Sequence, residues 1–203
     1  MSFVKFRTIA IAAAVLLGAV LAAYFGATRV NWNFARAVGE PIDSLDGVAV
    51  YYNGGVGHGS GRNLAPDGYN LGIKYQCVEF VKRYYYQRFN HKMPDAFGHA
   101  RDFFDGALAD GELNKARALL QFRNGGSSGP RAGDILVFDR WMLNPYGHVA
   151  IVARAGETEI EIVQQNGGPF ASSRETLALG TADGRWWIAA RRVLGWLRRP
   201  SLT

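Results

Sequence analysis

The sequence predicts an α+β fold in which helices come first and pack on an antiparallel β-sheet, preceded by one transmembrane helix. Three observations support this expectation. Residues 9–27 are uncharged and almost wholly apolar. Apolar and aromatic side chains then recur at helical spacing through residues 78–89. Beyond Pro130, short runs rich in strand-forming residues alternate with turn residues, as in a meander of antiparallel strands.

The apolar run at the N-terminus is long enough to cross a bilayer, because at about 1.5 Å of rise per residue it nearly matches a hydrocarbon core of roughly 30 Å. Lys5 and Arg7 precede the run, a pattern that signal peptides and uncleaved anchors share. Phe25 stands where a cleavage site needs a small residue. Residues 1–28 are therefore expected to remain as a single-pass cell-membrane anchor with the domain on the extracytoplasmic (periplasmic) side. Cleavage and secretion are the alternative.

The rest of the chain reads as one domain with short appendages. Residues 29–44 are a mixed polar stretch, expected to be a tether to a domain of residues 45–197, and residues 198–203 form a basic tail. Strand formers fill residues 47–52, and the Gly-rich residues 53–61 follow. This Gly-rich segment has neither the Gly-Lys-Ser/Thr ending of a nucleotide-binding loop nor dinucleotide spacing, so a surface loop is expected.

The spacing of apolar residues and the positions of turn residues predict the other helices and strands of the domain. Helices are expected over three segments, of which the first is the most strongly periodic: residues 78–89, 100–108 and 113–120. Strands are expected over four segments: residues 134–138, 148–153, 159–165 and 186–192. Turn residues at 154–157 and 182–185 separate the strands, and for this reason an antiparallel meander is expected.

Composition excludes several classes of function. The formal net charge is +6, from 23 Lys and Arg against 17 Asp and Glu, but the cations are scattered and no nucleic-acid partner is expected. A single cysteine, Cys77, excludes an internal disulfide and a cysteine-rich zinc site. His58, His91 and His99 lack metal-ligand spacing, and Asp67 is the lone carboxylate between residues 62 and 77. No metal or cofactor is expected.

Cys77 begins the most strongly periodic helix. The field at a helix N-terminus and nearby cations favour a thiolate, so Cys77 is a candidate nucleophile, although a lone cysteine is often a small buried hydrophobe. Cysteine catalysis needs a base or ion-pair partner, and His148 stands at the head of a strand where the backbone would hold its ring. Gln164 or Asn166, near the end of the next strand, would orient the imidazole. The loop before His148 offers Trp141 and Tyr146 as cleft-lining, substrate-binding candidates.

Four motifs in order, YQCVEFVKRYY, GDILVFD, GHVAIV and IEIVQQN, resemble the CHAP domain, a branch of the NlpC-type papain-like cysteine hydrolases that cleave amide bonds. The sequence is most similar to the amidase domain of glutathionylspermidine synthetase/amidase, since GVAVYYN and VLGWL also match. The resemblance implies a papain-like fold, Cys77 as nucleophile, His148 as base, and an oxyanion hole from the Gln76 side chain and the Cys77 backbone N–H. Gln164 replaces an acidic residue of the related amidase, so Asn166 is the alternative orienter.

The expected function is a membrane-tethered thiol amidohydrolase that works through an acyl-enzyme without a cofactor. A peptidoglycan peptide is the favoured substrate, because an N-terminal anchor would carry the domain away from cytosolic compounds. A glutathione–polyamine conjugate is the alternative that the motif similarity favours. A catalytically weak cell-wall-binding module with the same fold is an alternative of another class, since the orienting carboxylate is missing.

Overall fold

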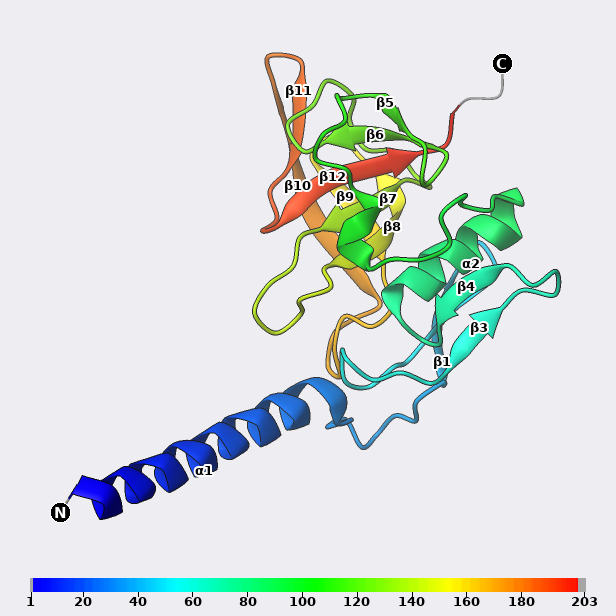
Figure 1. Ribbon diagram of the computed structural model, residues 1–203. Helices are drawn as coiled ribbons and strands as arrows, with labels where there is room; N and C mark the ends of the chain where they lie inside the picture. The colour runs from blue at the N-terminus through cyan, green and yellow to red at the C-terminus, as the bar shows by residue number, and fades with distance from the viewer. Residues whose placement is uncertain (1, 201–203) are drawn as a thin grey trace.

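The structure, a computed structural model, describes residues 2–200. Figure 1 shows one long helix projecting from a domain in which a shorter helix packs beside a β-sheet. The expected combination of helices with an antiparallel sheet is confirmed. Residues 201–203 of the predicted basic tail lie outside the described residues.

Residues 2–200 contain three helical elements and twelve strands. The helical elements are α1 (Ser2–Arg29), α2 (Cys77–Phe89) and the 3-10 helix η1 (Ala100–Phe103). The strands are β1 (Pro41–Leu45), β2 (Val48–Tyr51), β3 (Arg62–Leu64), β4 (Asn70–Ile73), β5 (Glu112–Asn114), β6 (Leu119–Arg123), β7 (Ile135–Phe138), β8 (His148–Ala155), β9 (Glu159–Val163), β10 (Arg174–Ala182), β11 (Arg185–Ile188) and β12 (Val193–Arg198).

The main sheet has eight strands in the order β11-β10-β9-β8-β7-β12-β6-β5, and every neighbouring pair is antiparallel. The strands from β7 to β11 form an antiparallel meander, as expected, but β10 is an additional strand that the sequence did not predict. Strand β12 returns from the end of the chain to lie between β7 and β6. The hairpins β1-β2 and β3-β4 form separate two-stranded sheets on the α2 side of the domain (Figure 1).

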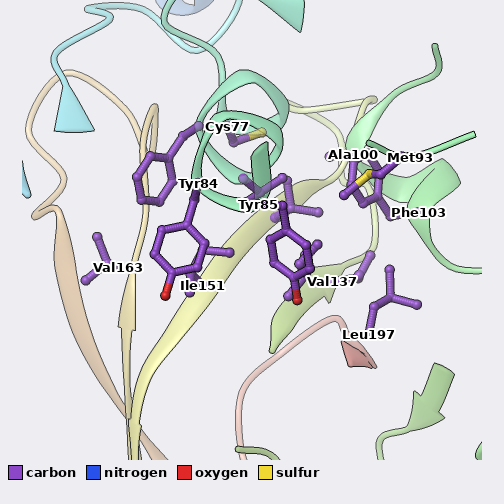
Figure 2. Close-up of a cluster of buried hydrophobic side chains, with 14 of the residues drawn as sticks. Cys77, Tyr84, Tyr85, Met93, Ala100, Phe103, Val137, Ile151, Val163 and Leu197 are labelled. Atoms are coloured by element: carbon purple, nitrogen blue, oxygen red, sulfur yellow. The ribbon is translucent and has the colours of Figure 1, made fainter. Parts of the chain in front are cut away.

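The two faces of the main sheet bury separate hydrophobic clusters, as the alternation of side chains along a strand requires. On β8, Val149 and Ile151 join α2 in one cluster, whereas Ala150 and Val152 join the other. Figure 2 shows the first cluster, with Cys77 at the end of α2. The sheet is therefore packed on both sides, and α2 is fixed against β8.

Two of the predicted helices are wrong. Residues 113–120, expected as a helix, instead belong to the hairpin β5-β6, whose turn places Ala118 in the left-handed region at a φ of 53°. Pairing of β6 with β12, distant in sequence, overrides the local helix propensity. The helix expected over residues 100–108 shortens to the single turn η1.

A buried ion pair anchors the first turns of α2. Glu79 and Arg83 lie 2.6 Å apart, with side chains 1% and 7% exposed. Gln165 Nε2 and Asn63 Nδ2 each donate to the Glu79 carboxylate at 2.8 Å, and Arg83 donates to the Ala49 carbonyl at 2.8 Å. These bonds join α2 to β2, β3 and the segment after β9. The position of Cys77 therefore depends on them.

We expect Glu79→Ala to lower the free energy of unfolding by about 3–5 kcal/mol, because it leaves the Arg83 guanidinium buried without its carboxylate. Urea unfolding of the full chain in detergent micelles, followed by circular dichroism, measures the loss. Glu40→Ala is the matched control. It breaks an i,i+4 pair with Arg36 whose side chains are 38% and 44% exposed, and should cost less than about 1 kcal/mol. Equal losses in the two variants would contradict the assignment of α2 anchoring to the buried pair.

Candidate active site

Cys77 is the first residue of α2, and its side chain is 6% exposed. Gln76 precedes it in extended conformation, and the first helical hydrogen bond runs from Phe80 N to Gln76 O at 3.2 Å. The backbone N–H groups of Cys77 and Val78 both face the sulfur. The thiol thus lies among the unpaired N–H groups that every helix N-terminus presents.

The sulfur also faces the backbone N–H of Val149, the residue after His148. Packing of α2 on β8 therefore brings the two candidate residues to the same end of one strand. Within residues 2–200, the thiol and the imidazole make no direct hydrogen bond to each other.

Burial raises the pKa of the Cys77 thiol to about 11, and the N–H groups of Val149, Val78 and Cys77 lower it only in part. The expectation that helix field and nearby cations favour the thiolate is wrong for this environment. The three cations on α2 have other partners. Arg83 binds Glu79, Lys82 donates to the carbonyls of Asn70 and Ala96, and Arg88 lies 3.8 Å from Asp46. Desolvation of the sulfur is the larger effect.

His148 is held by Gln164, whose Oε1 lies 2.9 Å from the imidazole Nε2. The amide nitrogen of Gln164 donates to Ser172 O at 3.2 Å and to Glu175 Oε2 at 3.3 Å. Because both contacts of that nitrogen are acceptors, the oxygen of Gln164 must face the ring, and His148 must donate from Nε2. A neutral imidazole then carries its lone pair on Nδ1, the position of a base.

Burial lowers the pKa of His148 to about 4, an effect that the hydrogen bond to Gln164 opposes in part. Near neutral pH the imidazole is therefore uncharged. Since the thiol of Cys77 is also uncharged there, the free site holds a neutral pair rather than a thiolate and an imidazolium.

Asn166 does not contact the imidazole. Strand β9 ends at Val163, and Asn166 takes a left-handed conformation with a φ of 62°. Its amide donates to Val56 O at 2.9 Å and to Gln76 Oε1 at 2.6 Å. Of the two expected orienters, Gln164 alone makes a hydrogen bond to His148.

The Gln76 amide is already bonded within the protein. Its nitrogen donates to the carbonyls of Val56 (3.3 Å) and His58, and its oxygen accepts from Asn166. Gln76 therefore holds the Gly-rich loop against the segment after β9. Both of its donors point to that loop, so an oxyanion role for this side chain requires these bonds to open.

Cys77 lines a cleft of about 450 Å³. Tyr146 lines it, as expected, but Trp141 does not, since its ring lies under the guanidinium of Arg192 at 5.2 Å. A larger hollow of about 620 Å³ lies at the other end of β8 and contains no cysteine or histidine. The smaller cleft is therefore the candidate site.

The charged side chains that line the cleft are all basic. Arg29 and Arg62 are its charged residues, and no Asp or Glu belongs to the lining. His99 also lines the cleft, with its ring centroid 4.7 Å from that of Tyr146. Among the described residues, no cluster of three His, Cys, Asp or Glu side chains could hold a metal ion.

Four of these residues were not expected at the site from the sequence: Arg29, Arg62, His99 and Glu175. Arg29 follows the apolar run, Arg62 begins the short strand β3 directly after the Gly-rich loop, and His99 lies in an irregular segment before η1. Glu175 lies on β10, a strand that was not expected, opposite Ile162 of β9. Its alternating Leu177 and Leu179 were the signal for that strand.

Comparison with known proteins adds a family match over half of the domain. Residues 67–166 match the CHAP domain family. Trypanothione synthetase of Crithidia fasciculata is 26% identical over 86% of this chain and 29% of its own length. The bifunctional glutathionylspermidine synthetase/amidase of Escherichia coli (strain K12) is 32% identical over 52% of this chain and 17% of its own length. The chain thus spans less than a third of either relative.

Among solved structures, the crystal structure of Ly7917 with the hydrolyzing product of MDP is 30% identical to this chain. The match covers 37% of this chain and 30% of that one, with a TM-score of 0.27.

We expect Gln164→Glu, combined with Glu175→Gln to avoid two adjacent carboxylates, to raise the pKa of His148 from about 4 to above its ordinary 6.5. A carboxylate at position 164 favours the imidazolium, whereas an amide cannot. NMR titration of the imidazole in the full chain, assigned with His148→Gln, measures this shift. Glu175→Gln alone is the control and should leave the pKa nearly unchanged. A native His148 that titrates near 6.5 would contradict the proposed neutral site.

Proposed function

We propose that this chain, whose residues 67–166 match the CHAP domain family, is an amide hydrolase that uses Cys77 as its nucleophile. One observation carries the proposal. The sulfur lies among N–H groups at the start of α2 and β8, where Gln164 holds His148 with its Nδ1 free to take a proton. A thiol, a base and a residue that orients the base are the parts of nucleophilic acyl transfer. The family match supports a papain-like fold for residues 45–197.

The first step is attack by the Cys77 sulfur on the substrate carbonyl, with its proton passing to His148 Nδ1 as the S–C bond forms. Because burial penalises both charged forms, proton transfer accompanies attack rather than preceding it. The Cys77 backbone N–H stabilises the tetrahedral oxyanion, and Gln76 can join it after releasing the Gly-rich loop. The C–N bond then breaks as His148 protonates the leaving amine.

The second half-reaction removes the acyl group from Cys77. His148, neutral again, takes a proton from water as the water oxygen attacks the thioester carbonyl. The S–C bond breaks, the sulfur recovers its proton from His148, and the carboxylic acid leaves. No cofactor takes part in this sequence.

A peptide of peptidoglycan is the substrate class that the cleft favours. Its two cations, Arg29 and Arg62, face no carboxylate in the lining, so they suit a substrate with free carboxylates. A glutathione–polyamine conjugate carries cationic amines on the leaving side, which these arginines disfavour. It remains the second candidate because a relative with 32% identity is named a glutathionylspermidine synthetase/amidase.

We also propose that α1 is retained as a membrane anchor with the domain on the extracytoplasmic side. Its segment Arg7–Arg29 is long and apolar enough to cross a bilayer, a test that a signal sequence also passes. Residues 29–44, expected as a tether, are packed against the domain and include β1. Membrane retention and this packing together would hold the cleft at a fixed place relative to the anchor.

We expect Cys77→Ala to abolish hydrolysis and His148→Gln to lower kcat/KM by about 10²–10⁴-fold, as for loss of a general base. The assay offers muropeptides and glutathionylspermidine to the full chain in detergent, with product amines measured by mass spectrometry. Turnover of muropeptides is expected. Turnover of glutathionylspermidine alone would reverse the substrate assignment, and binding of muropeptides without turnover of either compound would identify a non-catalytic binding module.

We expect Arg62→Ala to raise KM for an anionic peptide substrate by about tenfold, the effect of losing one charged hydrogen bond. The same substitution should have little effect on an analogue whose carboxylates are amidated. Arg154→Ala, at the other end of β8 and outside the cleft, is the matched control. Equal effects of Arg62→Ala on both substrates would contradict a carboxylate-binding role for this arginine.

A further inference from the structure

One arginine belongs both to the end of α1 and to the cleft. Arg29 is the last residue of the apolar segment Arg7–Arg29, and it lines the cleft together with Cys77. The segment has 23 residues. At about 1.5 Å per residue, its length matches a hydrocarbon core of roughly 30 Å. With α1 across a bilayer, Arg29 lies at the head-group level, and the rim of the cleft is one side chain away.

The C-terminal end of α1 packs closely against the domain. Thr28 is 5% exposed, and its carbonyl accepts a hydrogen bond from Gly57 N at 2.7 Å. A Cβ at Gly55 would come within 2.6 Å of the same carbonyl, so only glycine permits this approach. Asn33 Nδ2 bonds to Pro169 O at 3.0 Å, which ties the chain after α1 to the loop after β9.

Large apolar side chains are exposed around this junction. Trp32, Phe34 and Phe170 are 50%, 85% and 73% exposed, on the two segments that the bond from Asn33 joins. The loop between β7 and β8 adds Met142, which is 83% exposed. Figure 1 shows this loop and the loop after β9 on the side of the domain from which α1 projects. Exposed aromatic and apolar residues next to a membrane helix are typical of the lipid–water interface.

We propose that this face of the domain rests on the bilayer, so that the cleft opens at the lipid surface and takes an amide substrate carried by a membrane lipid. The face consists of Trp32, Phe34 and Phe170, on the two segments joined beside the end of α1, and Met142, on the loop between β7 and β8 on the same side of the domain. A substrate anchored in the same bilayer reaches Cys77 at head-group depth, where Arg29 and Arg62 meet its negative charges. The amide chemistry rests on the proposed function, whereas the placement on lipid does not.

Depth-dependent quenching tests the placement. Single cysteines are introduced by Phe34→Cys, Met142→Cys or Phe170→Cys into the full chain carrying Cys77→Ser, and each is labelled with an environment-sensitive fluorophore. The protein is reconstituted in phosphatidylcholine–phosphatidylglycerol vesicles that contain a spin-labelled lipid quencher near the head group. The control site is Leu113→Cys, on β5 at the far edge of the sheet and 42% exposed.

We expect quenching of most of the fluorescence at positions 34, 142 and 170 and none at position 113. Quenching at position 34 without quenching at 142 and 170 would overturn the proposal, because the domain would then stand away from the lipid. Equal quenching at position 113 would also overturn it, since contact with lipid would not be confined to this face.

Turnover of one peptide amide, offered free in solution or attached to a lipid in the same vesicles, tests the substrate class. Phe34→Ser with Phe170→Ser should lower the rate on the lipid-borne form by about tenfold and leave the free peptide unaffected. Leu113→Ser should change neither rate. Equal losses on both forms, or turnover of the free peptide alone, would overturn the lipid-borne substrate while leaving amide hydrolysis intact. Absence of turnover of either form would overturn the proposed function, and quenching would still decide the placement.

Discussion

The close packing of the first turn of α2 on β8 is the constraint on which the candidate site depends. It brings the Cys77 sulfur against the Val149 N–H and removes water from the thiol and from the neighbouring imidazole. The same desolvation that shapes the site sets its charges, because it raises the pKa of one group to about 11 and lowers the other to about 4. In such a site, the free-energy cost of moving the thiol proton from Cys77 to His148 is lowest when the substrate carbonyl is present, because formation of the S–C bond offsets the developing charge.

The neutral Gln164 amide is suited to orient His148 in a site where the thiol and the imidazole are both uncharged. A carboxylate in place of Gln164 would favour the imidazolium and so promote a standing ion pair at the expense of a resting neutral base. The Gln164 amide instead fixes the tautomer through one hydrogen bond, while Ser172 and Glu175 fix the amide. The Glu175 carboxylate thus acts on the ring only through the neutral amide of Gln164. An amide at position 164 is therefore compatible with the proposed catalysis, although it sets a different starting charge state from the one that a carboxylate would give.

Local patterns predicted the parts of this site that single elements supply. Helical spacing over residues 78–89 identified α2 to within one residue, and runs of strand-forming residues between turns identified β8 and β9. The failures are non-local. Residues 113–120 form a hairpin because β6 pairs with β12. Asn166 misses the imidazole because the chain turns left-handed after β9, and Arg29 enters the cleft because α1 docks on the Gly-rich loop. No spacing along the sequence encodes these approaches.

The basic charge of the cleft acts close to the end of α1, and therefore close to the surface of the bilayer in the proposed arrangement. Interactions between exposed charges are screened over about 8 Å at physiological ionic strength, so the net charge of +6 attracts little from afar. A bilayer with anionic head groups repels a peptide that carries carboxylates. Arg29 and Arg62 reverse that field only within the cleft, where no acidic side chain opposes them. For a substrate that is already anchored in the membrane, this repulsion lowers the affinity for the cleft only slightly, because the anchor keeps the substrate at the surface. The two arginines then need only to orient it.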